Sequence, residues 1–169
     1  MKHLIVCSVM WLCGWMVAMA QSVPQVIPAL QQWKPAKGKL VLPESGKVIV
    51  SSDEEEALKQ SAEILVQDLK EMFGWDYRVV AGKKEKGAVF LTLGKPDETL
   101  GDEGYRMDIR NEVTIEAPTS KGVFWGTRTL LQMIHNQSEG LMKGRATDFP
   151  LYPNRGFMID VAIIQIGRA

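Results

Sequence analysis

The stretch Tyr105-Arg106-Met107-Asp108-Ile109-Arg110-Asn111-Glu112-Val113-Thr114-Ile115-Glu116-Ala117 decides the fold. Apolar and polar residues alternate on both sides of Arg110-Asn111, which is typical of two half-buried strands. A two-residue connection suffices to join antiparallel strands, and asparagine tolerates the positive φ that tight hairpin turns require. The stretch therefore predicts a β-hairpin, with strands at residues 105–109 and 112–117.

A helix is predicted directly after this hairpin, over residues 121–135, with Ser120 as its N-cap. Its apolar face consists of Val123, Thr127, Leu130, Leu131 and Ile134. Gly122 and Gly126 are four residues apart, and their lack of side chains lets the helix lie close to a sheet. His135 falls in the last turn, where the helix dipole favours a cation, so we interpret it as structural and not catalytic.

A first helix is predicted over residues 53–73, and Gly74 is its natural end. Ser52 is the expected cap, with Glu55 completing a capping box. The apolar face repeats every three or four residues, at Leu58, Ala62, Leu65, Leu69 and Met72. Further strands are predicted at residues 38–42, 47–50, 75–81 and 88–93.

This order of elements predicts an α+β fold, a small mixed or antiparallel sheet with two helices on one face. We assign the domain to residues 38–147, and residues 21–37 to an extended, proline-containing lead-in. Residues 148–169 are assigned to a linker and one further strand. The run from Arg155 to Ile164 is apolar on both faces apart from Asp160, which is typical of a strand inside a parallel sheet. Since few residues follow, we expect the first strand of a second, truncated domain.

Residues 1–20 have the pattern of a secretory signal peptide. A short basic start precedes the apolar run Leu4–Ala18, and Ala18-Met19-Ala20 forms a cleavage signal before Gln21. The run is too short to span a bilayer. We therefore expect a protein exported to the periplasm, the outer surface or the medium, with no membrane span after cleavage near Ala20-Gln21.

Composition narrows the possible chemistry. The chain has 20 Lys+Arg and 20 Asp+Glu, so loss of Lys2 with the signal leaves 19 against 20, a net charge of −1. This balance argues against nucleic acid as a partner, because neutralising phosphates needs a basic stripe. Cys7 and Cys13 both precede the cleavage point, so the mature chain has no disulfide. With His135 as its only histidine, it has no zinc site of ordinary composition, and we expect no metal.

No pair of acidic residues is marked as catalytic by its surroundings. The acidic residues 54–56 are explained by the preference of a helix N-terminus for negative charge. Asp108 and Glu116 are expected on the polar face of the hairpin, in contact with solvent. Three tryptophans could stack on sugar rings, although large aromatic side chains in a small domain more often belong to the core: Trp33, Trp75 and Trp125.

Four stretches, in this order, resemble the front part of family 20 glycoside hydrolases, the β-N-acetylhexosaminidases. They are Gly101-Asp102-Glu103-Gly104-Tyr105, the glycine-spaced Gly122–Gln132, Asp148-Phe149-Pro150, and Arg155-Gly156-Phe157-Met158-Ile159-Asp160. The resemblance implies an α+β domain ahead of a catalytic (β/α)₈ barrel. It also implies removal of terminal N-acetylglucosamine or N-acetylgalactosamine from glycans, with retention. The nucleophile in this family is the substrate's own acetamido oxygen, and no metal or organic cofactor is needed.

The resemblance implies one site residue. Arg155 would open the first barrel strand and bind sugar hydroxyls in the subsite that holds the cleaved residue. The family's catalytic Asp-Glu pair has no counterpart, so we expect no catalytic residue here and no activity from this chain alone. The family pattern calls for arginine where this chain has Ile163, which indicates an altered reading frame or a fragmentary gene. An alternative stays open, a secreted non-catalytic carbohydrate-binding or interaction module.

Overall fold

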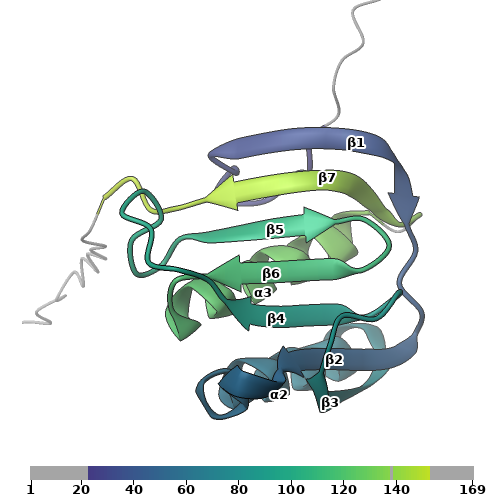
Figure 1. Ribbon diagram of the computed structural model, residues 1–169. Coiled ribbons are helices and arrows are strands. Elements are labelled where there is room, and N and C mark those ends of the chain that lie inside the picture. Colours follow the sequence, from purple (N-terminus) through teal and green to yellow (C-terminus); the bar gives the residue numbers. More distant parts are fainter. Residues whose placement is uncertain (1–22, 138, 153–169) are drawn as a thin grey trace, which may run out of the picture.

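The computed structural model describes residues 23–137 and 139–152 (Figure 1). Their strands are β1 (Gln32–Leu40), β2 (Ser45–Ser51), β3 (Asp76–Gly82), β4 (Val89–Leu93), β5 (Tyr105–Ile109), β6 (Val113–Ala117) and β7 (Leu141–Asp148). Their helices are the short 3₁₀-helix η1 (Ser52–Glu54), α2 (Glu55–Phe73) and α3 (Ser120–Asn136).

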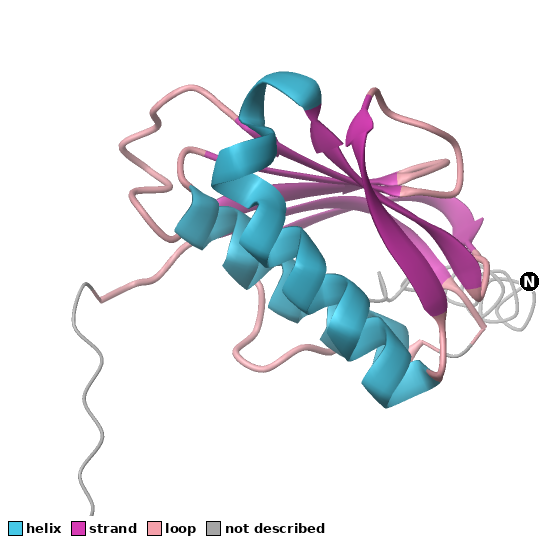
Figure 2. Ribbon diagram, turned by 90° about the horizontal axis from the view of Figure 1, so that it is seen from below, coloured by secondary structure: helices cyan, strands magenta, loops and turns pink. Residues whose placement is uncertain are grey.

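The strands form one mixed, seven-stranded sheet in the order β1-β7-β5-β6-β4-β2-β3. β2 runs parallel to β3 and β4, and β4 runs parallel to β6. β5 is antiparallel to β6 and β7, and β1 is antiparallel to β7. Both long helices lie across the same face of the sheet (Figure 2). The predicted α+β fold, with two helices on one face, is confirmed.

The core lies between this sheet and the helices. Helix α2 buries Leu58, Ala62, Leu65 and Leu69 against it, as its periodicity predicts. Met72, which we expected on the same stripe, is 54% exposed. The predicted hairpin is present, with Arg106 opposite Glu116 and Ile109 opposite Val113. Its connection is residues 110–112, one residue longer than predicted, and Asn111 does not have the positive φ that we expected. Its inward side chains are almost fully buried: Tyr105, Met107, Ile109, Val113 and Ile115.

Two glycines allow α3 to approach the sheet. A Cβ atom at Gly126 would lie 2.5 Å from Cγ2 of Ile115, and one at Gly122 would lie 2.3 Å from the carbonyl oxygen of Gly104. Atoms do not pack this closely in protein interiors, so any larger residue would push the helix outwards. The close approach predicted from the spacing of these glycines is confirmed.

The two outer strands at one edge differ from the prediction. β1 begins at Gln32 and ends at Leu40, so the strand predicted at residues 38–42 is wrong at both ends. Its register shifts between Pro35 and Lys39. An edge strand tolerates Pro35, which we interpreted as part of the lead-in. β7 was not predicted at all. Its Lys143-Gly144-Arg145 centre hides the alternation, and Gly144 is needed because a Cβ there would lie 2.5 Å from the Trp33 ring.

The helix caps also differ. Ser52 does not cap α2, because residues 52–54 form the 3₁₀-helix η1 ahead of it. No side chain caps η1 or α2. Glu54 is used elsewhere, since its carboxylate accepts bonds from the Thr92 hydroxyl at 2.9 Å and from the Leu93 backbone at 2.7 Å. The cap of α3 is Thr119 and not Ser120, with the Thr119 hydroxyl accepting a bond from Gly122 N at 3.2 Å. The stop at Gly74 is confirmed, with φ of 73°.

Several expectations lie outside the described residues: the signal peptide at residues 1–20, the strand at 155–164 and the role of Arg155. Within residues 23–137 and 139–152, no helix is both long and apolar enough to cross a bilayer.

Candidate functional site

A cleft of about 540 Å³ lies between residues 27–31, one side of α3 and the segment that follows β7. Its apolar lining consists of Ile27, Pro28, Ala29, Trp125, Phe149, Pro150, Leu151 and Tyr152. Its polar lining includes Gln31, Glu103, Arg128, Gln132 and Asp148. Ile27, Leu151 and Tyr152 are 86%, 66% and 76% exposed, so much of this apolar surface faces solvent.

Hydrogen bonds fix the walls of the cleft. Gln132 of α3 accepts a bond from Ile27 N at 2.8 Å and donates one to the Ile27 carbonyl at 3.1 Å. Asp148, at the end of β7, accepts bonds from Gln31 N and from the Tyr105 hydroxyl, both at 3.2 Å. These contacts tie residues 27–31 to α3 and to the end of β7, so two walls of the cleft are held together.

Tyr105 connects the floor of the cleft to the core. Its hydroxyl lies 2.6 Å from that of Thr129 and also bonds to Asp148. Burial raises the pKa of Tyr105 far above its usual value, because the phenolate would lose its hydration. The phenol is a buried contact that joins β5 to α3 and to the end of β7.

Arg128 of α3 links the two long helices, α2 and α3. Its guanidinium forms an ion pair with Asp68 of α2 and lies 4.8 Å from the centre of the Phe124 ring. The side chains of Arg128 and Asp68 are 24% and 25% exposed, so the pair is largely shielded from solvent. Arg128 thus holds α2 and α3 together beside the cleft.

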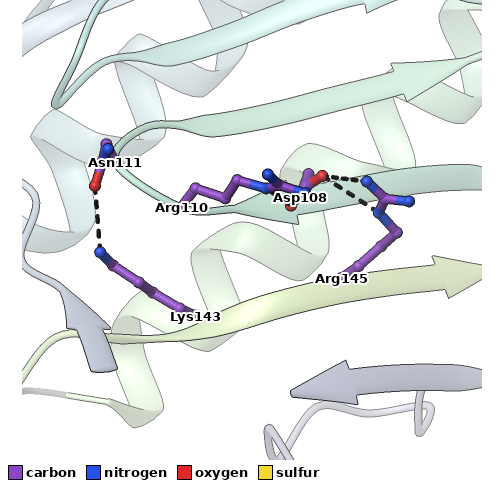
Figure 3. Close-up of polar contacts among 5 residues, drawn as sticks. All are labelled: Asp108, Arg110, Asn111, Lys143 and Arg145. Carbon is purple, nitrogen blue, oxygen red and sulfur yellow. Dashed lines mark hydrogen bonds and ion pairs between the residues drawn. The ribbon is translucent and has the colours of Figure 1, made fainter. Parts of the chain in front are cut away.

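The other face of the sheet carries charged residues (Figure 3). Asp108 of β5 accepts a bond from Nε of Arg110 at 3.0 Å and from Nη2 of Arg145 of β7 at 2.6 Å. Lys143 donates to the Asn111 side chain at 3.3 Å. Burial alone would raise the pKa of Asp108, but the hydrogen bonds from the two arginines outweigh it and lower that pKa. Asp108 is 26% exposed, so the prediction that it is simply solvated is wrong.

Of the tryptophans considered as sugar-stacking residues, one lines the cleft. Arg155 lies outside the described residues, so its role in sugar binding stays a prediction. Trp33 and Trp75 are half-buried and pack against the core, as we interpreted them, whereas Trp125 is 37% exposed and lines the cleft. His135 is exposed, with its ring 6.4 Å from that of Phe73.

Sequence reasoning missed Gln132, Asp148 and Tyr152 as neighbours in one site. Asp148 stood out only as the start of Asp-Phe-Pro, and its partner Gln31 lies 117 positions earlier in the chain. Chemically, the cleft offers aromatic and aliphatic surface with hydrogen-bonding groups at its margin. Among the described residues, no three His, Cys, Asp or Glu side chains are grouped so as to hold a metal ion.

The fold and the cleft define an α+β domain with an apolar surface beside the point at which the chain continues. Residues 23–149 match the sequence profile of glycosyl hydrolase family 20, domain 2. The chain therefore belongs to glycosyl hydrolase family 20, and the predicted resemblance is confirmed.

Relatives of known activity or structure agree with this assignment. The lacto-N-biosidase of Bifidobacterium bifidum is 30% identical over 145 residues, which is 85% of this chain and 13% of that protein. The β-N-acetylhexosaminidase of Streptomyces coelicolor superposes with a TM-score of 0.63 at 26% identity, over 79% of this chain and 28% of that one. The chitobiase of Flavobacterium johnsoniae has a TM-score of 0.61 at 24% identity, over 78% and 21%, and it supports the fold alone. This chain thus spans a minor part of each relative.

Proposed function

We propose that residues 23–149 are the accessory domain of an exported β-N-acetylhexosaminidase, and that the reaction centre of that enzyme lies outside them. The observation that carries the proposal is the match of residues 23–149 to domain 2 of family 20. The relatives include a lacto-N-biosidase and a β-N-acetylhexosaminidase, which favours glycans ending in N-acetylhexosamine as substrates of the complete enzyme. Its reaction would be retaining hydrolysis assisted by the substrate's acetamido group, with Arg155 binding sugar hydroxyls in a barrel beyond this domain.

The cleft supports an accessory role. Its exposed apolar side chains lie next to Tyr152, the last described residue, where the chain continues towards the proposed barrel. Contiguous apolar surface on a small domain usually marks a contact site. The cleft would thus pack against the catalytic barrel and hold it in place, contributing stability and no chemistry.

The experiment is a hydrolysis assay on an aryl β-N-acetylglucosaminide. We expect no turnover from this chain alone. We expect turnover when residues 23–152 replace domain 2 in the Streptomyces coelicolor enzyme, because the barrel then supplies the catalytic pair. Trp125→Asp and Leu151→Asp should lower the yield of active chimera, and Lys37→Ala, on exposed β1, serves as the matched control. Hydrolysis by the isolated chain would contradict the proposal.

Export is tested separately. The expected product in the periplasm, on the outer surface or in the medium begins at Gln21, and N-terminal sequencing of the exported protein identifies it. An exported protein that still carries residues 1–20, or retention of the whole chain in the cytosol, would contradict this part of the proposal.

One observation favours the second candidate, a carbohydrate-binding module. Trp125 and Tyr152 line a cleft whose volume of about 540 Å³ suits a small ligand, and both rings are partly exposed. This candidate predicts that N-acetylglucosamine or its dimer changes the tryptophan fluorescence of the chain, and that Trp125→Ala abolishes the change. The accessory-domain proposal predicts no saturable change.

A further inference from the structure

The two edges of the sheet are protected very differently. β1 forms one edge and β3 the other (Figure 1). β1 carries Pro35, a register shift between Pro35 and Lys39, and three lysines at positions 34, 37 and 39. Proline, lysine and irregular register are the devices by which natural proteins block unwanted strand pairing. The β1 edge is therefore closed to further strands.

β3 has no proline, no lysine and no register shift, and its charged residues, Asp76 and Arg78, lie in its first half. Its seven residues pair in unbroken register with β2, from Asp76 opposite Ser45 to Gly82 opposite Ser51. Its second half, Val79-Val80-Ala81-Gly82, is uncharged. Among the described residues, β3 pairs only with β2. Its outer side therefore offers a straight row of backbone donors and acceptors to another strand.

Apolar side chains flank this edge on both faces of the sheet. On the helix side, Trp75 stacks on Tyr77 with ring centres 6.0 Å apart, and Val79 packs against the core. On the other side, Val80 packs beside Ile49 and Phe90 in a small second cluster. A strand added here would gain apolar contacts as well as backbone hydrogen bonds.

We propose that β3 is a dimerisation edge, at which β3 of a second copy of this chain adds in antiparallel orientation. A two-fold axis at Val79 places Tyr77 opposite Ala81 of the second copy, a large residue against a small one. It places Arg78 opposite Val80, and it brings Asp76 towards the Lys83-Lys84 end of the second copy. An axis at Arg78 would oppose the two arginines, which is unfavourable.

The symmetry limits the assembly. Each copy uses its single open edge, and the closed β1 edge cannot extend the sheet further. A two-fold contact of this kind is self-complementary and ends at a dimer, whereas a head-to-tail contact could grow into fibres. The contact involves one strand per copy, so we expect a reversible, weak dimer.

The experiment is sedimentation analysis of purified residues 21–169 over about 10 µM to 1 mM, the range in which a weak dimer shows concentration dependence. We expect a monomer–dimer equilibrium. In the proposed dimer, Val80→Lys places the lysine of each copy opposite Arg78 of the other. These two like-charge pairs should raise the dissociation constant about tenfold or more. Adding Arg78→Glu to that variant creates two opposite-charge pairs and should restore dimerisation.

A second β3 variant guards against a folding defect in Val80→Lys, because Val80 is half-buried. Asp76→Lys changes an exposed position and should also weaken the dimer. Thermal melts at low concentration check that each variant is folded. Lys37→Glu on β1 is the matched control and should leave dimerisation unchanged. A wild-type chain that is monomeric over the whole range would overturn the proposal. So would an association that neither β3 substitution weakens, because it would use another part of the chain.

Discussion

The hydroxyl oxygens of Tyr105 and Thr129 lie 2.6 Å apart where β5 meets α3, and the same phenol also reaches Asp148 at the end of β7. Three elements thus meet at one buried polar group. Tyr105→Phe should lower the free energy of unfolding by about 1–2 kcal/mol, because it leaves the Thr129 hydroxyl buried with one partner fewer. Urea unfolding measures the change.

The coupling between these two residues is itself a test. If the hydroxyl pair carries the effect, Tyr105→Phe and Thr129→Val together should cost less than the sum of the single changes, since the double variant leaves no orphaned group. Strictly additive losses would show that the contact contributes nothing specific.

The closeness of α3 to the sheet predicts a second outcome. Gly126→Ala should destabilise the domain by about 1–3 kcal/mol, because the added methyl group overlaps Ile115 and crowds the Tyr105 ring. Thermal unfolding measures it. Lys121→Ala, at an exposed position of the same helix, is the matched control. Equal stability of both variants would mean that the helix can move outwards without cost.

The cap of α3 predicts a third outcome. Thr119→Ala should cost about 1 kcal/mol, because Gly122 N loses its acceptor at the start of the helix. Ser120→Ala, the change that the sequence alone would have chosen, should cost much less. Circular dichroism during urea unfolding compares the two, and the reverse ranking would contradict the observed cap.

The lowered pKa of Asp108 predicts a pH dependence. A carboxyl group whose pKa is lower in the folded state stabilises the protein above its unfolded pKa, and this contribution is lost as pH falls through the folded pKa. Asp108→Asn should therefore cost about 0.5–1 kcal/mol at neutral pH, since the ion pairs are partly exposed. The difference from wild type should shrink in acid, below about pH 5, in unfolding curves recorded from pH 7 downwards. A difference that stays constant with pH would show that the charge of Asp108 does not matter.

Much of the fold could be predicted because its signals are local. The alternation of residues 105–117 and the three-to-four spacing in α2 are patterns of nearby positions, and the hairpin and the helix are both present, although α2 and β6 begin later than predicted. β7 escaped prediction because its alternation is broken at Gly144, whose identity depends on Trp33, more than a hundred positions away. Ser52 is not a cap because residues 52–54 form η1, in which the Glu54 carboxylate bonds to Leu93 at the end of β4.

The cleft shows the same division. Trp125 was a candidate for sugar stacking on composition alone, but nothing local joins it to Ile27 or Tyr152. The bonds between Ile27 and Gln132 span 105 positions, so no local pattern in the sequence predicts them.

From the sequence alone, both long helices, the hairpin, the inner strands, most of their buried faces and the family could be determined, because periodicity, turn residues and short motifs are properties of neighbouring positions. The tertiary structure decided the pairing of β1 with β7, the open β3 edge and the cleft. These features depend on contacts between distant residues, which are set by the path of the whole chain and by the sum of all its packing.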